Sequence, residues 1–252
     1  MRRIFLSVIL AAAVASLPAR TAPSEGTKPH WTYRGHEGPE HWGDLDPAFS
    51  ACKTGNEQSP IDITKPAAEH LPAIQFSYKA SPLAIVDNGH TVQVNYGPGS
   101  SIDVGGHRYE LKQFHFHHPS ENKLHGKASA LEIHFVHADA DGKLAVVGVL
   151  VDEGAANPAL QTLWDNIPKT KGRESKVAGV NVNAAELLPA THGYYNFPGS
   201  LTTPPCSEGV SWFLLKAGDH ASGEQIAAFA KLYPLNARPV QPLHGRTIRE
   251  SQ

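Results

Sequence analysis

Three histidines lie on two segments whose residues alternate between polar and apolar. In the segment 113–117, QFHFH, the alternation is strict, and successive side chains of a β-strand point to opposite faces. His115 and His117 therefore share one face of a predicted strand. In the segment 131–136, LEIHFV, Glu132, His134 and Val136 share one face, and Leu131, Ile133 and Phe135 share the other. If the two strands are neighbours, three imidazoles can meet around one metal ion.

Three imidazoles and one open coordination position are typical of a catalytic zinc site, whereas four protein ligands close a structural site. Calcium and magnesium prefer oxygen ligands, but copper or cobalt can bind the same set. Gln113 and Glu132 each precede a histidine by two residues on the same face. They are expected to accept hydrogen bonds from the ring nitrogens that face away from the metal. The nearby His118, His125 and His137 are out of phase or off the strands, and are interpreted as surface or core residues.

The elements that must position these histidines are mostly strands. Alternating or continuous apolar runs predict strands over residues 83–87, 91–96, 109–117, 130–138, 144–151 and 210–215. Two helices are predicted, one beginning after an N-cap at Asn157 and one after a capping box formed by Ser222 and Gln225. Apolar residues as far as Ile167 fall on one face of the first helix. Residues 31–59 look irregular, so one domain dominated by β-structure is expected.

Composition limits the classes of function. The chain has 252 residues, of which 40% are hydrophobic and 18% charged, and this suits one large globular domain. A net charge of -2 gives no reason to expect binding to nucleic acid or to an anionic membrane surface. The 15 histidines favour metal or proton chemistry.

The first 22 residues have the layout of a secretory signal peptide. Arg2 and Arg3 precede an apolar run over residues 4–14, and small residues follow. The run is much shorter than the roughly 20 residues of a membrane span, although an uncleaved anchor is an alternative. We expect cleavage within residues 15–22, one domain over residues 27–252, and a periplasmic or extracellular location.

Cys52 and Cys206 are the only cysteines. In an oxidising compartment such a pair is expected to form one disulfide; two buried free thiols are the alternative. A disulfide closing a loop of about 150 residues stabilises a protein by roughly 5 kcal/mol in the chain-entropy description.

Several rare strings resemble the signature segments of alpha-class carbonic anhydrases. They are HWG at 41–43, QSPIDI at 58–63, NGH at 88–90, QFHFH at 113–117, ALEIHFVH at 130–137, GSLTTPPC at 199–206 and NARPVQPL at 236–243. They follow the family order over essentially the whole mature chain, and the two cysteines resemble the bacterial secreted branch, which has this disulfide. The resemblance implies a mainly β (α+β) fold: a large, mostly antiparallel twisted sheet with a few short surface helices and a conical active-site cavity.

The resemblance also implies an activity, the reversible hydration of carbon dioxide to bicarbonate and a proton by a zinc-bound hydroxide. In this family His115, His117 and His134 match the zinc ligands, and His90 matches the proton shuttle. Thr202 matches the gatekeeper threonine, and Glu121 the glutamate that orients it. Residues matching the carbon dioxide pocket are Val136, Val146, Leu201, Val210 and Trp212, with Thr203 at the bicarbonate or inhibitor contact and Asn88 and Gln93 lining the cavity. Inhibition by sulfonamides or anions is expected, and a homodimer is compatible with the resemblance.

Three positions depart from the family pattern. Asp44 stands where many members have a tyrosine that helps to order cavity water, which bears on proton relay. Asn122 replaces a common histidine after Glu121, which bears on local stability. Phe197 replaces a common tyrosine.

Two other functions fit part of the pattern. One is a catalytically silent binding protein of the same fold, although the branches that have lost activity have lost ligands and all three histidines are present here. The other is a periplasmic zinc buffer, suggested by the histidine content. A buffer predicts more than one tightly bound zinc per chain and no sensitivity to sulfonamides.

Overall fold

The computed structural model describes residues 29–252, so the predicted signal peptide lies outside the described residues. The strands are β1 (Asp62–Ile63), β2 (Ala67–Glu69), β3 (Ile74–Ser77), β4 (Ser81–Asp87), β5 (Val92–Asn95), β6 (Ser101–Val104), β7 (His107–His117), β8 (Lys123–Leu124), β9 (Leu131–Ala138), β10 (Leu144–Glu153), β11 (Ser175–Val182), β12 (Tyr194–Ser200), β13 (Glu208–Leu215), β14 (Asp219–Ala221) and β15 (Arg249–Ser251). The α-helices are α1 (Trp42–Leu45), α2 (Ala51–Thr54), α3 (Pro158–Trp164) and α4 (Gly223–Leu232), and 3-10 turns cover η1 (Gly35–Glu37), η2 (Pro47–Phe49) and η3 (Ala184–Leu187).

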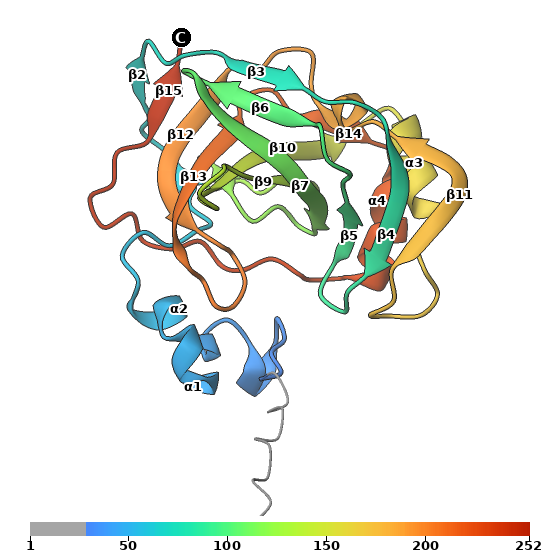
Figure 1. The fold of residues 1–252 in the computed structure, drawn as a ribbon. Coiled ribbons are helices and arrows are strands. Elements are labelled where there is room, and N and C mark those ends of the chain that lie inside the picture. Colours follow the sequence, from blue (N-terminus) through green and yellow to red (C-terminus); the bar gives the residue numbers. More distant parts are fainter. Residues whose placement is uncertain (1–28) are drawn as a thin grey trace, which may run out of the picture.

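A 13-stranded sheet dominates the described chain. Its main path runs β11-β4-β5-β7-β9-β10-β13-β12-β15-β2. Most neighbours are antiparallel, and β10 pairs in parallel with β13 and β14. Figure 1 shows the sheet as strongly curved, with α1 and α2 beneath it and α3 and α4 beside β4 and β11. The mainly β fold with a mostly antiparallel sheet and a few short helices, expected from the resemblance, is confirmed.

Each predicted strand is present, with bounds shifted by at most two residues at either end. The helix predictions are also confirmed in their caps. The Asn157 side chain accepts hydrogen bonds from two backbone N–H groups at the start of α3, and Ser222 and Gln225 form the capping box of α4. Helix α3 ends at Trp164, however, so Ile167 lies beyond it. This residue still packs against the apolar core.

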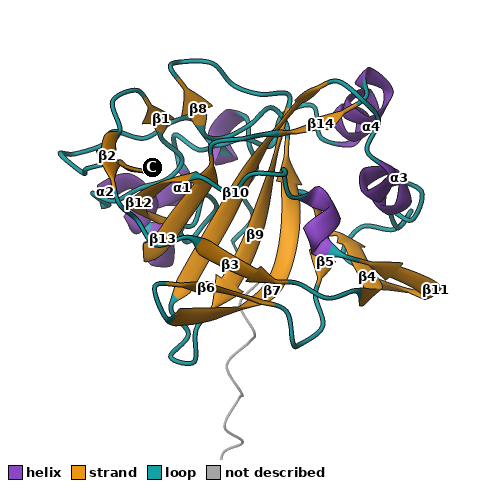
Figure 2. Cartoon of the chain, turned by 90° about the horizontal axis from the view of Figure 1, so that it is seen from above, coloured by secondary structure: helices purple, strands orange, loops and turns teal. Residues whose placement is uncertain are grey.

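The two faces of the central strands have different partners. Phe114 and Phe116 of β7 are fully buried in the larger hydrophobic cluster, where Trp164 of α3 and Phe229 of α4 contact Phe116. Figure 2 shows α3 and α4 together on one side of the sheet. The helices therefore cover the phenylalanine face of β7, and its histidine face is left for a site.

The segment between the N-terminal end and β1 is tied to the loop between β12 and β13. Cys52 of α2 and Cys206 form a disulfide, which confirms the predicted pair. Both pack with Trp42 in a small apolar cluster of their own. Within residues 29–252, helices remain too short and too polar to cross a membrane.

Candidate metal centre

The register between β7 and β9 brings the three histidines together. His115 lies directly opposite His134 in the antiparallel pair, and His117 is on the same face of β7 as His115. One ring nitrogen from each residue can be chosen so that all three lie within 4.8 Å of one another. His117 and His134 are each 1% exposed, and His115 is half-buried. The adjacency of the two strands, expected from the sequence, is present.

The second ring nitrogen of each histidine has an oxygen neighbour. His115 Nδ1 donates to Gln113 Oε1 at 2.8 Å, and His117 Nδ1 donates to the backbone oxygen of Asn236 at 2.7 Å. His134 Nε2 lies 3.0 Å from Glu132 Oε1, although the approach is too oblique for a hydrogen bond. These contacts select which nitrogen of each ring is left for a metal.

The donor set fits a zinc ion. His117 Nε2 is buried and has no hydrogen-bond partner among the described residues, a costly arrangement for a polar atom unless a ligand satisfies it. Burial lowers the pKa of both His115 and His117, and for His115 the neighbouring histidines lower it further. The imidazoles are therefore held neutral, which is the form that binds a metal.

Glu132 is fixed behind His134 by a set of donors. Its Oε2 accepts from the backbone N–H groups of Glu121 and Asn122, both at 2.8 Å. Its Oε1 accepts from Asn122 Nδ2 at 2.7 Å. Burial opposes ionisation of this carboxyl, but His134 and the Asn122 donors outweigh burial and hold its pKa below the ordinary value. Asn122 thus completes the set of donors around the carboxylate.

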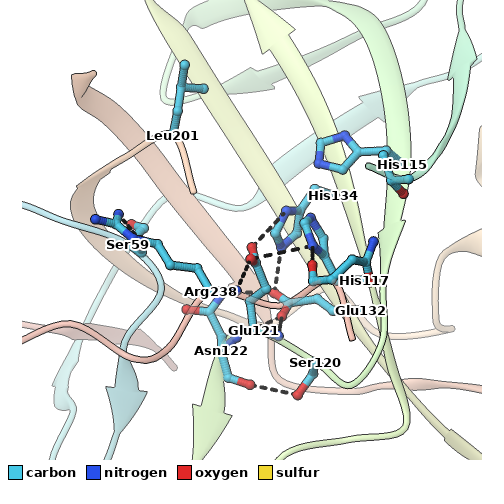
Figure 3. A network of polar contacts seen from close by, with 12 residues as sticks. Ser59, His115, His117, Ser120, Glu121, Asn122, Glu132, His134, Leu201 and Arg238 are labelled. Carbon is cyan, nitrogen blue, oxygen red and sulfur yellow. Dashed lines mark hydrogen bonds and ion pairs between the residues drawn. The ribbon is translucent and has the colours of Figure 1, made fainter. Parts of the chain in front are cut away.

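Glu121 lies beneath the histidines in a second buried contact (Figure 3). Its Oε1 accepts from the backbone N–H of Arg238 at 2.8 Å, whereas its Oε2 has no hydrogen-bond partner in the described part of the chain. Burial raises the pKa of Glu121 to about 7, against the opposing effects of His134, the Arg238 N–H and the Thr202 hydroxyl. Thr202 is itself buried. Glu121 and Thr202, paired by the resemblance, are therefore neighbours.

A cavity of about 260 Å³ opens above the histidines. Its lining includes His90, Asn88, Gln93, Gln113, Val136, Val146, Leu201, Thr202, Thr203 and Trp212. Val210 is absent from this lining, because it is buried in the apolar cluster with Val146 and Trp212. A larger cavity of about 700 Å³ lies between residues 33–41 and 235–240, shares only Tyr33 with the first, and contains none of the three histidines.

His90 lies at this cavity on the turn between β4 and β5. Its ring stacks on Trp31, with ring centroids 3.7 Å apart and an interplanar angle of 8°. Partial burial lowers its pKa, and the nearby His30 and Lys171 lower it further. The imidazole is therefore neutral at neutral pH and able to accept a proton.

Two of the family departures lie away from the cavity. Asp44 is exposed and forms an ion pair with Lys53 at 2.8 Å. The tyrosine that lines the cavity is Tyr33, so the expectation that Asp44 bears on cavity water is wrong. Phe197 is buried, and its ring stacks parallel to that of Trp212.

Sequence reasoning missed two residues that hold the centre, Asn236 and Arg238. Asn236 is fully buried and accepts from His117, and Arg238 donates its backbone N–H to Glu121. Both belong to the string NARPVQPL, whose only signal in the sequence is its resemblance to the family. Their contacts join residues more than one hundred positions apart, so no local spacing could have indicated them.

Comparisons with known proteins agree with this geometry. The profile of the eukaryotic-type carbonic anhydrase family matches residues 37–252. A carbonic anhydrase of Pectobacterium carotovorum is 47% identical over 87% of this chain and 90% of that protein. One of Nostoc sp. (strain PCC 7120 / SAG 25.82 / UTEX 2576) is 42% identical over 92% of this chain and 89% of that protein.

Solved structures are similar as well. A hyperthermostable carbonic anhydrase from an active hydrothermal vent chimney has a TM-score of 0.86 and 49% identity, covering 88% of this chain and 100% of that one. The alpha-carbonic anhydrase of Thermovibrio ammonificans, solved with the inhibitor sulfanilamide, has a TM-score of 0.85 and 42% identity, with the same coverage.

Proposed function

This chain belongs to the eukaryotic-type, or alpha, carbonic anhydrase family and is accordingly a carbonic anhydrase. We propose that it hydrates carbon dioxide at the three-histidine centre. In the proposed reaction, carbon dioxide and water give bicarbonate and a proton, reversibly, with one zinc ion held by His115, His117 and His134. One observation carries the proposal: the ligand atoms of three imidazoles converge within 4.8 Å at the floor of a cavity with apolar walls.

Zinc, when bound, supplies a Lewis acid that lowers the pKa of water to about 7, a value established on carbonic anhydrase itself. The protein keeps His115 and His117 neutral by burial and orients all three imidazoles for this ion. Gln113 and Glu132 act on His115 and His134, and the backbone oxygen of Asn236 acts on His117. These oxygen neighbours also raise the basicity of the rings.

Thr202 orients the attacking hydroxide. Its hydroxyl can donate only one hydrogen, and the buried Glu121 carboxylate beside it has an oxygen without a partner. If that hydrogen goes to Glu121, the Thr202 oxygen is left as an acceptor. That oxygen would accept a hydrogen bond from the nucleophile that a zinc ion held by the three histidines would supply, and would direct it at the carbon, a positioning effect.

The apolar wall binds the substrate. Carbon dioxide has no charge, so it partitions to Val136, Val146, Leu201 and Trp212, which line the cavity beside the histidines. Val210 shapes this wall from behind by packing on Val146 and Trp212. Thr203 offers a hydroxyl at the same cavity, where bicarbonate needs polar contacts.

His90 removes the product proton. A histidine with a pKa below its ordinary 6.5 accepts a proton from the cavity and releases it readily to solvent or buffer. The ring lies at the cavity on Trp31. With His90 replaced by alanine, turnover in poor buffer should fall and should recover with added imidazole. Equal rates in every buffer would assign the proton transfer to another group.

The compartment and the partners follow from other observations. The Cys52–Cys206 disulfide fits an oxidising compartment, which supports a signal peptide over residues 1–22 and a periplasmic or extracellular location. The 13-stranded sheet that dominates the described residues supports a single domain over 27–252. Sulfonamides and anions should inhibit the enzyme, because the similar Thermovibrio ammonificans enzyme was solved with sulfanilamide. A homodimer, compatible with the family resemblance, is tested by the mass of the purified protein in solution.

The ligand assignment has a direct test. His115→Ala should lose zinc after dialysis and lose hydration activity, because two imidazoles cannot hold the ion tightly. His118→Ala is the matched control, since that ring lies outside the three-histidine group, and it should retain both. An active, zinc-loaded His115→Ala protein would contradict the assignment.

A further inference from the structure

The turn that carries His90 is built by two side chains of its own. Asn88 Oδ1 accepts from the backbone N–H groups of His90 and Thr91, both at 2.9 Å. Asp87 Oδ1 accepts from the backbone N–H of Gly89 at 3.0 Å. These local contacts shape the turn, but they do not fix where it lies relative to the three histidines.

Asp87 also has partners from distant parts of the chain. Its carboxylate accepts from the hydroxyl of Tyr233, which follows α4 directly, and its backbone oxygen accepts from Gly172 N–H at 2.7 Å. Both Asp87 and Tyr233 are buried. Burial and the Asp87 carboxylate hold the pKa of Tyr233 far above its ordinary value, so this hydroxyl always serves as the donor.

The segment that begins at Tyr233 continues into the metal centre. Three residues later, Asn236 donates from Nδ2 to the backbone oxygen of His90 at 3.0 Å and accepts from His117 Nδ1 at 2.7 Å. Arg238 then donates its backbone N–H to Glu121 at 2.8 Å. One short segment, residues 233–238, therefore contacts the His90 turn, a metal ligand and the carboxylate beside Thr202.

Within this segment, Tyr233 is the residue whose side-chain hydrogen bond goes to the His90 turn and not to the metal centre. Its ring packs on Phe229 and lies beneath Lys171. A carboxylate buried at the end of a strand is costly, and a neutral side chain could form the same local turn. The turn is already held at His90 by Asn236 and at Thr91, whose hydroxyl donates to the backbone oxygen of Phe116 in β7. The Tyr233 contact adds a further attachment, at Asp87, to the segment that also holds His117. Proton transfer depends steeply on distance and orientation. This attachment should therefore raise the rate of proton transfer through His90, because it holds the His90 ring in place.

We propose that Tyr233 is a positioning residue for proton transfer, acting through its hydrogen bond to Asp87 on the turn that carries His90. The proposal rests on the proposed function of His90. Tyr233 itself is absent from the lining of the cavity above the histidines and acts only through Asp87.

Tyr233→Phe tests the proposal, because it removes the hydroxyl and leaves the ring. In poor buffer, where the proton must leave through His90, kcat should fall about tenfold. The ratio kcat/KM for carbon dioxide should stay within roughly twofold, because that ratio does not include the exit of the proton. Added imidazole should restore kcat, since a free base replaces the mispositioned ring.

Two further variants separate positioning from general stability. Tyr194→Phe is the matched control, because it also removes the hydroxyl of a buried tyrosine. That hydroxyl donates to Pro72 O at 2.7 Å, and the ring packs on Phe213. Neither Tyr194 nor Phe213 lines the cavity above the histidines. It should leave kcat unchanged. In the double variant His90→Ala/Tyr233→Phe, the second change should lower kcat no further than His90→Ala alone, because both act on one step.

The outcomes are distinct. Tyr233→Phe with wild-type kcat, in an enzyme that His90→Ala slows, overturns this inference and leaves the proposed function intact. An equal fall in kcat and kcat/KM without rescue by imidazole, or a further fall in the double variant, also overturns it. If His90→Ala has wild-type rates in every buffer, the shuttle assignment itself fails, and the role of Tyr233 fails with it.

Discussion

The substitution Asn122→Ala tests how firmly the centre depends on the residues behind its ligands. Asn122 is fully buried between two groups. Its Nδ2 donates to Glu132 Oε1 at 2.7 Å, and its Oδ1 accepts from the backbone N–H of Ile61 at 3.0 Å. Alanine removes both contacts and leaves the backbone of residue 122 in place to donate to Glu132.

The expected cost follows from these two contacts. A hydrogen bond to a charged acceptor contributes about 1.5–3 kcal/mol, and a buried N–H left without a partner costs about 1–3 kcal/mol. The free energy of unfolding should therefore fall by roughly 2.5–6 kcal/mol. Glu132 also loses one donor that holds it beside His134, and changes of this kind weaken metal binding by about 10- to 100-fold.

Two assays measure this prediction. Denaturant unfolding with zinc in excess gives the change in stability, and competition with a chelator gives the zinc dissociation constant. Asn166→Ala is the matched control, because Asn166 Nδ2 donates to Thr162 O at the end of α3, far from the histidines in the fold. It should cost about 1 kcal/mol and leave zinc affinity unchanged. The reasoning is refuted if Asn122→Ala costs less than about 1 kcal/mol and binds zinc as the wild type does.

Two other predictions concern stability. His137 is buried, and burial lowers its pKa from 6.5 to about 3. Below pH 6.5, therefore, His137 is protonated in the unfolded chain but stays neutral in the folded chain. Stability is therefore lost as pH falls from 6.5, by about 2 kcal/mol between pH 7 and pH 5, and His137→Gln should remove that part of the pH dependence in urea unfolding; equal pH dependence in both proteins would contradict this. Cys52→Ser/Cys206→Ser opens a loop of 154 residues and should lower the free energy of unfolding by up to about 5 kcal/mol. If the free energy of unfolding falls by less than about 1 kcal/mol, removal of the disulfide adds little conformational entropy to the unfolded chain, which contradicts this prediction.

The sequence predicted the ligand strands because their signal is local. Alternation is strict around His115 and His117 and runs from Leu131 to Phe135 around His134, so it is visible within a few residues. The caps of α3 and α4 are short motifs. Gln113 and Glu132 were found by the same rule, since each shares a face with the ligand two positions later. The adjacency of β7 and β9 cannot be read from the sequence, because the pairing of two strands is not encoded in either one alone.

The parts that could not be predicted depend on distant contacts. The pairing of β7 with β9 shifts register between Leu111 and Gln113, and this irregularity lies before the histidines. Asn236 reaches His117 across 119 positions. The burial of Val210 behind the cavity wall, and the presence of Tyr33 instead of Asp44 at the cavity, likewise follow from packing.

The most direct test of the central claim combines zinc content with stopped-flow hydration of carbon dioxide. The purified protein should contain one zinc per chain and hydrate carbon dioxide well above the uncatalysed rate. A strong chelator should remove the metal and the activity together, and added zinc should restore both. Protein that holds one zinc per chain at His115, His117 and His134 yet hydrates carbon dioxide no faster than buffer would contradict the account.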